Sequence, residues 1–291
     1  MTQPPRVSIG FPVYNGETYL EEALDALLNQ TFTDFELIIS DNASSDRTEA
    51  ICRDYASRDA RIRYYRNAEN LGAAPNYNRT FGLATGEYFK WAADDDRCEP
   101  TLLARCVDRL DQHPAAVLAY PRTVFTKPDG RKWWTAKVAP RLAAETPHQR
   151  FEAAIANFWC VEVFGLIRRE QLAKTSLIAS YYGSDKLLLA QLSLLGPLLL
   201  VDEPLFYRRC HANQSSRLSH EEREIWIDSQ AAKRSKLWRP RNSVELFKSV
   251  LRLPLSWPER LRCLGVLWQK LLSNLPQTLA HRLQPRVPTK V

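Results

Sequence analysis

Short runs of apolar residues alternate with amphipathic stretches through the first hundred residues. The apolar runs at residues 7–12 and 35–40 have the length and composition of buried strands. The stretch between them has apolar residues at helical spacing, namely Leu20, Ala23, Leu24, Leu27 and Leu28. This alternation predicts an α/β fold in which a mostly parallel sheet is covered by helices.

The same pattern continues to about residue 216. It predicts further strands at residues 61–66, 88–93, 116–120, 161–167 and 198–201, a hairpin over 123–136, and helices beginning near residue 46, at 76–84, at 100–110, from 146 and at 184–195. Beyond residue 216 the alternation stops, and the remaining chain is helical with proline breaks. We therefore expect one α/β domain over residues 1–216 and a C-terminal helical extension over residues 217–291.

Positive charge is concentrated in that extension. Residues 221–291 contain 14 Lys and Arg against 6 Asp and Glu, whereas residues 1–220 contain 26 against 27. A near-neutral body with a basic, leucine-rich tail indicates contact with an anionic membrane surface and argues against nucleic acid. The tail is equally consistent with a helix packed on the domain, or on a second subunit of a homo-oligomer.

Two further features bear on location. The chain has no apolar leader near its first residue, and its longest apolar run, residues 187–201, is shorter than the ~20 residues a spanning helix needs. Its six cysteines lack metal-binding spacing and are expected to be reduced thiols. These features predict a cytoplasmic protein, either free or bound peripherally to the inner face of the membrane.

An acidic triplet, Asp94, Asp95 and Asp96, follows the predicted strand at residues 88–93. Ligands of open α/β sheets bind beyond the carboxyl ends of the strands, and carboxylate oxygens suit Mg²⁺ or Mn²⁺. Taken alone, the triplet is equally typical of a solvated acidic turn.

Four motifs stand in order before and around this triplet. They read VSIGFPVYNG at residues 7–16, SDNASSD at 40–46, NLG at 70–72 and GEYFKW at 86–91. Together they resemble the inverting family 2 of GT-A glycosyltransferases, over about residues 6–216. The resemblance implies a nucleotide diphosphate sugar donor, a saccharide or lipid-linked acceptor, and Mn²⁺ or Mg²⁺ as cofactor.

The resemblance also implies which residues bind the nucleotide. They are Pro12, Tyr14, Asn15, Asp41, Asn70 and Asp94. Three of them have an alternative role. Tyr14 could be a surface turn residue, Asp41 could form an Asx-turn, and Asn70 could be a turn or cap residue.

The acidic motif departs from that of many relatives, because Ala93 occupies their first Asp position. The register counted from Pro100 makes Asp95 the leading metal ligand, with Asp94 nearer the ribose and Asp96 either assisting or uninvolved. After the last strand, the resemblance implies His211 as a further metal ligand, and the alternative is that this lone histidine is structural. Arg208 and Arg209 are implied to bind the diphosphate.

Relatives carry their general base in an acidic pair at the start of a late helix. Asp185 stands at that place and is the predicted base, although Ser184 replaces the Glu of the common pair. The alternative is that Asp185 only caps its helix.

These inferences predict metal-dependent, inverting transfer of a sugar to an acceptor hydroxyl, in the synthesis of a cell-surface polysaccharide or glycolipid. A rival is a catalytically silent module that binds sugar nucleotides or assembles with partners, which the replacements at Ala93 and Ser184 would permit. A nucleotidyltransferase is disfavoured, because the chain lacks a Gly-rich basic phosphate loop after the first strand.

Overall fold

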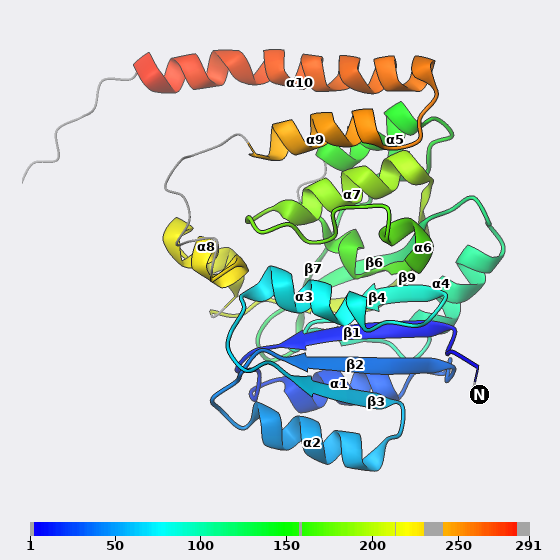
Figure 1. Cartoon of the computed structure of the whole chain (residues 1–291), viewed down its shortest axis with the longest axis vertical. Helices are drawn as coiled ribbons and strands as arrows, with labels where there is room; N and C mark the ends of the chain where they lie inside the picture. Colours follow the sequence, from blue (N-terminus) through cyan, green and yellow to red (C-terminus); the bar gives the residue numbers. More distant parts are fainter. Residues whose placement is uncertain (1–2, 157–158, 213, 230–240, 284–291) are drawn as a thin grey trace, which may run out of the picture.

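A nine-stranded sheet runs through the centre of the molecule (Figure 1). The computed structural model describes residues 3–156, 159–212, 214–229 and 241–283. The strand order is β3-β2-β1-β4-β8-β6-β9-β5, with β7 paired to β6. The strands are β1 (Val7–Val13), β2 (Phe35–Asp41), β3 (Ile62–Arg66), β4 (Tyr88–Trp91), β5 (Arg97–Cys98), β6 (Leu118–Thr126), β7 (Lys132–Thr135), β8 (Leu166–Arg168) and β9 (Leu198–Arg209).

Helices cover both faces of this sheet. They are α1 (Leu20–Leu28), α2 (Thr48–Arg58), α3 (Ala73–Gly82), α4 (Leu102–Asp111), α5 (Pro147–Ala156), α6 (Arg169–Leu172), α7 (Ser184–Leu195), α8 (His220–Ile227), α9 (Arg241–Arg252) and α10 (Trp257–Leu283), with 3-10 turns η1 (Pro140–Ala143), η2 (Val161–Phe164) and η3 (Ser215–Arg217). The predicted α/β architecture with a C-terminal helical extension is confirmed.

Strands β3, β2, β1 and β4 are parallel, so their carboxyl ends meet at one edge of the sheet. All seven residues of β1 and of β2 are buried, as expected for central strands covered on both faces. Figure 1 shows the arrowheads of β1 and β2 pointing to the same side of the molecule. This edge positions the loops that carry the motifs.

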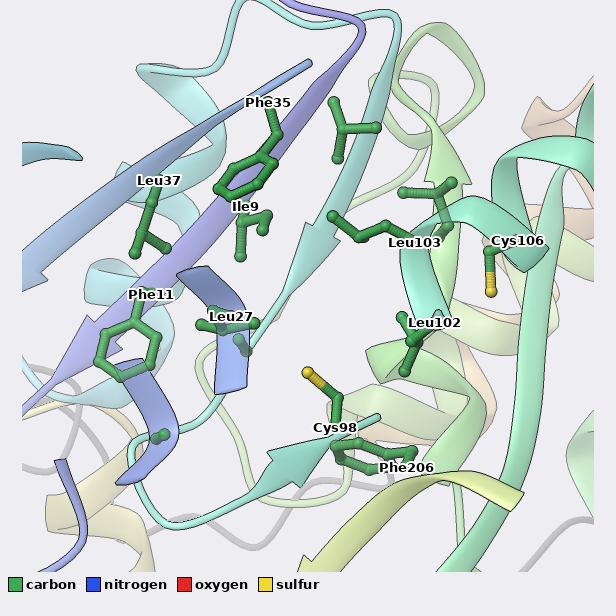
Figure 2. Packing of buried hydrophobic residues seen from close by; sticks show 14 of the residues in the cluster. Ile9, Phe11, Leu27, Phe35, Leu37, Cys98, Leu102, Leu103, Cys106 and Phe206 are labelled. Atoms are coloured by element: carbon green, nitrogen blue, oxygen red, sulfur yellow. The ribbon is translucent and has the colours of Figure 1, made fainter. Parts of the chain in front are cut away.

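Two hydrophobic clusters occupy the two faces of the sheet. The first joins β1 and β2 to α1, α2 and α4, and Figure 2 shows Ile9, Phe11 and Leu37 packed towards Leu27, Leu102 and Leu103. The second joins the opposite face, including Phe89 and Trp91 of β4, to α5, α7, α9 and α10. The described part of the C-terminal extension thus shares a core with the rest of the chain, and the boundary at residue 216 stays a prediction.

Some predicted elements have different bounds. Residues 161–164 form η2 instead of a strand, and only Leu166–Arg168 pairs in the sheet. Strand β9 continues to Arg209 rather than ending at residue 201, with register shifts opposite Pro121–Thr123 of β6. Polar residues and Pro204 in its second half hide the apolar pattern, so the extension of β9 towards the triplet was missed. Among the described residues, no helix is long and apolar enough to cross a membrane.

Candidate active site

The loops after β1 and β2 are joined by hydrogen bonds at the carboxyl edge of the sheet. Asn15 has a left-handed backbone with φ of 51°. Its Oδ1 accepts from the backbone N–H of Ser45 at 2.8 Å, and its own N–H donates to Oγ of Ser44 at 3.0 Å. Tyr14 precedes it with 46% of its surface exposed. The motif Tyr14-Asn15 therefore forms an ordered turn with an available aromatic ring, whereas Pro12 lies buried in β1.

Gly16 brings this turn against the acidic triplet. A Cβ at Gly16 would lie 2.1 Å from Oδ2 of Asp94, which is too close for two atoms that are not bonded. The Gly16 N–H also donates to Oγ1 of Thr48, the first residue of α2, at 2.9 Å. The contact between this backbone and the Asp94 carboxylate therefore requires glycine. Sequence reasoning did not single out Gly16 as a site residue, and its place at the end of the first motif was the available signal.

Asp41, at the end of β2, is fully buried and organises the neighbouring loop. Its Oδ1 accepts from the Ser44 N–H at 2.8 Å, which is the Asx-type turn considered as the alternative. Its Oδ2 accepts from the Tyr64 hydroxyl at 2.8 Å and from the Arg66 guanidinium. Contact of Asp41 with a nucleotide stays a prediction.

Asn70 belongs to a network of amide side chains that fixes the loop before α3. Its Oδ1 accepts from Nδ2 of Asn42 at 2.8 Å and from the Gly72 N–H at 2.9 Å. Its carbonyl oxygen accepts from the Ser229 hydroxyl at 3.0 Å, so the residues after α8 lie on this loop. Buried Asn76 supports the network by accepting from the Ser40 hydroxyl at 2.7 Å.

The end of β9 and the residues after it place Arg209 and His211 on the acidic triplet. Nε2 of His211 lies 2.9 Å from Oδ2 of Asp95. The backbone N–H of Arg209 donates to Oδ1 of Asp96 at 3.0 Å, and its Nε donates to the carbonyl oxygen of Asp95 at 3.1 Å. The Tyr19 ring packs on the His211 ring with centroids 5.3 Å apart. Asp95 and His211, both predicted metal ligands, are thus brought together by the fold.

Burial and mutual repulsion perturb the carboxylates of the triplet. Burial, followed by the charge of Asp95, raises the pKa of Asp94 to about 8. The same two causes raise the pKa of Asp96 well above its ordinary value. A cation beside the triplet would relieve this cost, because it stabilises the charged forms.

The side chains at the acidic triplet can supply some, but not all, of the ligands of a bound metal ion. Among the described residues, no group of three or more His, Cys, Asp or Glu side chains is arranged to hold a metal by itself. Asp95 and His211 supply two donors, and Mg²⁺ or Mn²⁺ commonly takes one or two carboxylates and completes its shell with water and substrate phosphate. The residues therefore fit an ion shared with a diphosphate.

Arg208 and Arg209, both predicted phosphate ligands, differ in availability. The Arg209 guanidinium is buried, donating to Asp95, to the Pro128 carbonyl oxygen at 2.7 Å and to Glu22. Arg208 lies over the Phe125 ring at 5.8 Å and makes no hydrogen bond or ion pair with its side chain within the described residues. Its charge lowers the pKa of both Asp96 and Asp185. The charge of Arg208 therefore favours ionisation both in the acidic triplet and at Asp185.

Asp185 is the second residue of α7, within the first turn of the helix. The residue that caps α7 is Gly183, with φ of 85°, and the Asp185 carboxylate accepts the Lys186 N–H at 2.8 Å. Burial raises the pKa of Asp185, and the charges of Arg208 and Lys186 oppose that rise. A raised pKa suits a group that must accept a proton.

An aromatic cluster that sequence reasoning missed adjoins Arg208, whose guanidinium lies over the Phe125 ring. Trp134 of β7 stacks on Phe125 of β6, with ring centroids 3.9 Å apart and planes 7° from parallel. The Trp159 ring lies 4.8 Å from that of Trp134. The next residue, Cys160, has its pKa raised by burial and by the charge of Asp185. The sequence signal available was the tryptophan pair within the predicted hairpin.

Comparisons with known proteins agree with these features. The family model described as Glycosyl transferase family 2 matches residues 8–175. The uncharacterized glycosyltransferase EpsJ of Bacillus subtilis is 38% identical over 109 residues, which cover 38% of this chain and 31% of EpsJ. The GalNAc(5)-diNAcBac-PP-undecaprenol beta-1,3-glucosyltransferase of Campylobacter jejuni is 34% identical over 115 residues, or 39% of this chain and 37% of that protein. This chain thus aligns with about a third of these relatives' length.

Solved structures are similar over nearly the whole chain. TarS 1-349 from S. aureus in complex with UDP has a TM-score of 0.66 at 18% identity, covering 93% of this chain and 72% of that one. The mannosyltransferase PcManGT from Pyrobaculum calidifontis, in complex with GDP-Man and Mn2+, has a TM-score of 0.57 at 18% identity. The match covers 97% of this chain and 82% of that one. At this identity the likeness concerns the fold, and the predicted GT-A fold is confirmed. Since the family model spans more than half of its residues, the chain belongs to glycosyl transferase family 2.

Proposed function

We propose that this protein transfers a sugar from a nucleotide diphosphate sugar to an acceptor hydroxyl with inversion at the anomeric carbon. The observation that carries the proposal is the contact of Asp95 with His211, 2.9 Å apart, at the strand edge that also holds the Gly16–Asp94 contact. Asp185 supplies a further carboxylate, and the charge of Arg208 favours the ionised forms of both Asp96 and Asp185.

The donor occupies the loops at the ends of β1, β2 and β4. Tyr14 offers an exposed ring to the base, and Asp94 lies beside the Gly16 backbone where a ribose would approach. Similar folds hold UDP-GlcNAc in TarS and GDP-Man in PcManGT, which supports a nucleotide sugar as the ligand class.

Asp95 and His211 would hold a divalent ion, with Asp94 and Asp96 adding negative charge beside it. When bound, Mn²⁺ or Mg²⁺ supplies positive charge to the leaving nucleoside diphosphate. Arg208 would contribute from the protein side, since its guanidinium makes no ion pair within the described residues and can therefore pair with a phosphate.

Asp185 takes the proton of the acceptor hydroxyl. Direct inversion needs a base on the face of the sugar opposite the leaving group, and one carboxylate is sufficient for this step. The partly buried position of Asp185 raises its pKa and therefore its basicity. Ser184, which replaces the Glu of the common pair, is buried and leaves Asp185 as the acid of this turn.

The acceptor is a saccharide or a lipid-linked saccharide. Trp134 and Trp159 belong to the aromatic cluster that Arg208 contacts through Phe125, and such rings provide apolar area with defined geometry. The Campylobacter jejuni relative is named for an undecaprenol-linked glycan, which is consistent with this acceptor class.

Turnover with a panel of UDP-, GDP- and dTDP-sugars tests the proposal. We expect nucleoside diphosphate release in the presence of Mn²⁺ or Mg²⁺ and a glycan acceptor, with loss of activity in chelator. Asp185→Asn should bind the donor without transferring the sugar. Nucleotide binding by the wild type without turnover on any acceptor would instead favour a silent binding module, and full activity in chelator would exclude the metal role.

A further inference from the structure

The exposed large apolar side chains of this protein are concentrated on the last two helices. Eight of the fourteen such side chains in the described residues lie on α9 and α10, namely Val244, Phe247, Leu251, Trp257, Leu261, Trp268, Leu271 and Leu272. Soluble surfaces rarely carry so contiguous an apolar set, and a patch of this kind normally has a partner.

The spacing of these residues places them on the outer side of the two helices. Val244, Phe247 and Leu251 recur at intervals of three and four along α9, while Leu246, Val250 and Leu253 are buried against α7. In α10 the buried residues are Cys263 and Leu267, which join the same cluster. Both helices bury one face in this common core, and their exposed apolar residues lie beside that face, on the part of each helix that solvent reaches. Figure 1 shows α10 as the outermost layer, beyond α9 and α5.

The segment that carries this surface has an excess of positive charge in its sequence. Residues 241–283 contain seven Lys and Arg against two Glu, and Arg252 is exposed near the end of α9. Glu245 is paired with Lys248 at 2.8 Å. Glu259 is mostly buried, where it meets His148 and Arg262. Both described acidic groups of the α9–α10 segment are therefore already neutralised by cations.

Charge complementarity selects the partner. A second copy docking through the same face would bring two positive surfaces together, which is unfavourable in a two-fold contact. Anionic lipid headgroups would instead pair with the cations while the apolar side chains enter the acyl boundary. Trp257 and Trp268 suit this boundary, because tryptophan combines a large apolar ring with one N–H donor.

We propose that the exposed face of α9 and α10 binds the surface of an anionic bilayer, with its tryptophan and leucine side chains inserted at the headgroup level. This surface lies on the opposite side of α5 and α7 from the sheet, so the binding does not depend on the proposed reaction. It makes the protein a peripheral membrane protein that docks through a defined helical layer.

Flotation of the full-length chain with vesicles tests this proposal. We expect binding to vesicles of phosphatidylcholine containing phosphatidylglycerol, at least about tenfold weaker binding to phosphatidylcholine alone, and a loss of binding as salt is raised. The double variant Trp268→Ser/Leu272→Ser should lose at least about tenfold in apparent affinity, because both side chains are exposed and their burial in lipid would be lost. Reversal of two cations, Lys248→Glu and Arg252→Glu, should weaken binding only to the anionic vesicles.

A matched control removes apolar side chains elsewhere. Trp133→Ser/Ile225→Ser changes two side chains that are each 57% exposed, and it should bind vesicles like the wild type. Thermal unfolding of each variant establishes that the substitutions leave the fold intact. The proposal would be overturned by absence of binding to anionic vesicles. It would equally be overturned if light scattering found a dimer that Trp268→Ser/Leu272→Ser dissociates, since the face would then be a contact between copies.

Discussion

Nε2 of His211 and Oδ2 of Asp95 lie 2.9 Å apart, although 116 positions separate them in the chain. The contact depends on β9, whose last residues pair with β6 while Arg209 donates its backbone N–H to Asp96. Two distant motifs, the strand-end acids and the histidine after the last strand, therefore form one site.

This relationship leads to a prediction about metal affinity. Asp95→Asn and His211→Ala should each weaken Mn²⁺ binding at least about tenfold in the presence of nucleoside diphosphate, because each removes one donor. Isothermal titration of Mn²⁺ provides the measurement. His113→Ala is the matched control, since His113 contacts the Arg109 carbonyl oxygen at the end of α4. Unchanged affinity in both site variants would exclude the pair as ligands.

Removal of the proposed base should affect turnover and leave binding intact. Asp185→Asn keeps the shape of the side chain but cannot accept the proton, so kcat should fall by about 10²–10⁴-fold. The Kd for nucleoside diphosphate should stay within a factor of about two, as expected for a group that acts on the acceptor. Asp108→Asn, on the exposed face of α4, is the control and should retain full activity. A normal kcat for Asp185→Asn would assign Asp185 to helix structure alone.

The pH dependence of the reaction should report the same carboxylate. Burial raises the pKa of Asp185, and Arg208 and Lys186 oppose the rise. The base works in its ionised form, so kcat/KM should increase with pH through the pKa of Asp185 and be lost below it. Arg208→Gln removes a cation that favours ionisation, and the acidic limb should therefore move to higher pH.

In the same experiment, Arg208→Lys tests whether the positive charge of residue 208 or the shape of its guanidinium controls the acidic limb. Lysine retains the positive charge, so the acidic limb should stay close to that of the wild type even if the KM for the donor rises. A limb that is identical in wild type, Arg208→Gln and Arg208→Lys would show that a different group controls the pH profile.

The contact between Gly16 and Asp94 should not tolerate a methyl group. Gly16→Ala would place Cβ 2.1 Å from Oδ2 of Asp94, so the loop or the carboxylate must move. We expect nucleotide affinity to fall at least about tenfold, since such overpacking typically costs about 1–3 kcal/mol. Gly82→Ala is the control, because a Cβ at Gly82 meets nothing within 4 Å. Equal nucleotide affinity for the two variants would contradict this close approach.

The buried Asp41 carboxylate should contribute to stability through Arg66. Arg66→Met leaves a fully buried carboxylate without its cation, and we expect a loss in the free energy of unfolding that exceeds the loss from an exposed ion pair. Urea denaturation at constant m-value provides the measurement. Arg53→Met removes an exposed ion pair with Glu49, and it should cost about 0.5 kcal/mol or less. Similar losses for both variants would mean that the Asp41–Arg66 pair acts like a surface pair.

The helices and strands predicted from the local sequence pattern agree best with the structure where an element is buried on nearly all sides. Strands β1 and β2 begin at the predicted residues and helix α7 has the predicted bounds, because each is a largely apolar run bounded by turn residues. Residues 161–164 were wrongly predicted as a strand, since an apolar run can equally pack as a turn against β6. The second half of β9 was missed because Asp202, Glu203 and Pro204 interrupt its apolar pattern.

The sequence by itself determined the family, the order of the motifs and the chemistry of the candidate residues, since these depend on residue type and spacing along the chain. Tertiary structure decided which of those residues meet. It brought His211 to Asp95 and placed Gly16 against Asp94. It also buried the Arg209 guanidinium among hydrogen-bond acceptors of the protein, whereas the Arg208 guanidinium is unpaired in the described residues. It also turned one apolar face of α9 and α10 outward. Such relations depend on contacts between residues far apart in the chain, and local periodicity carries no information about them.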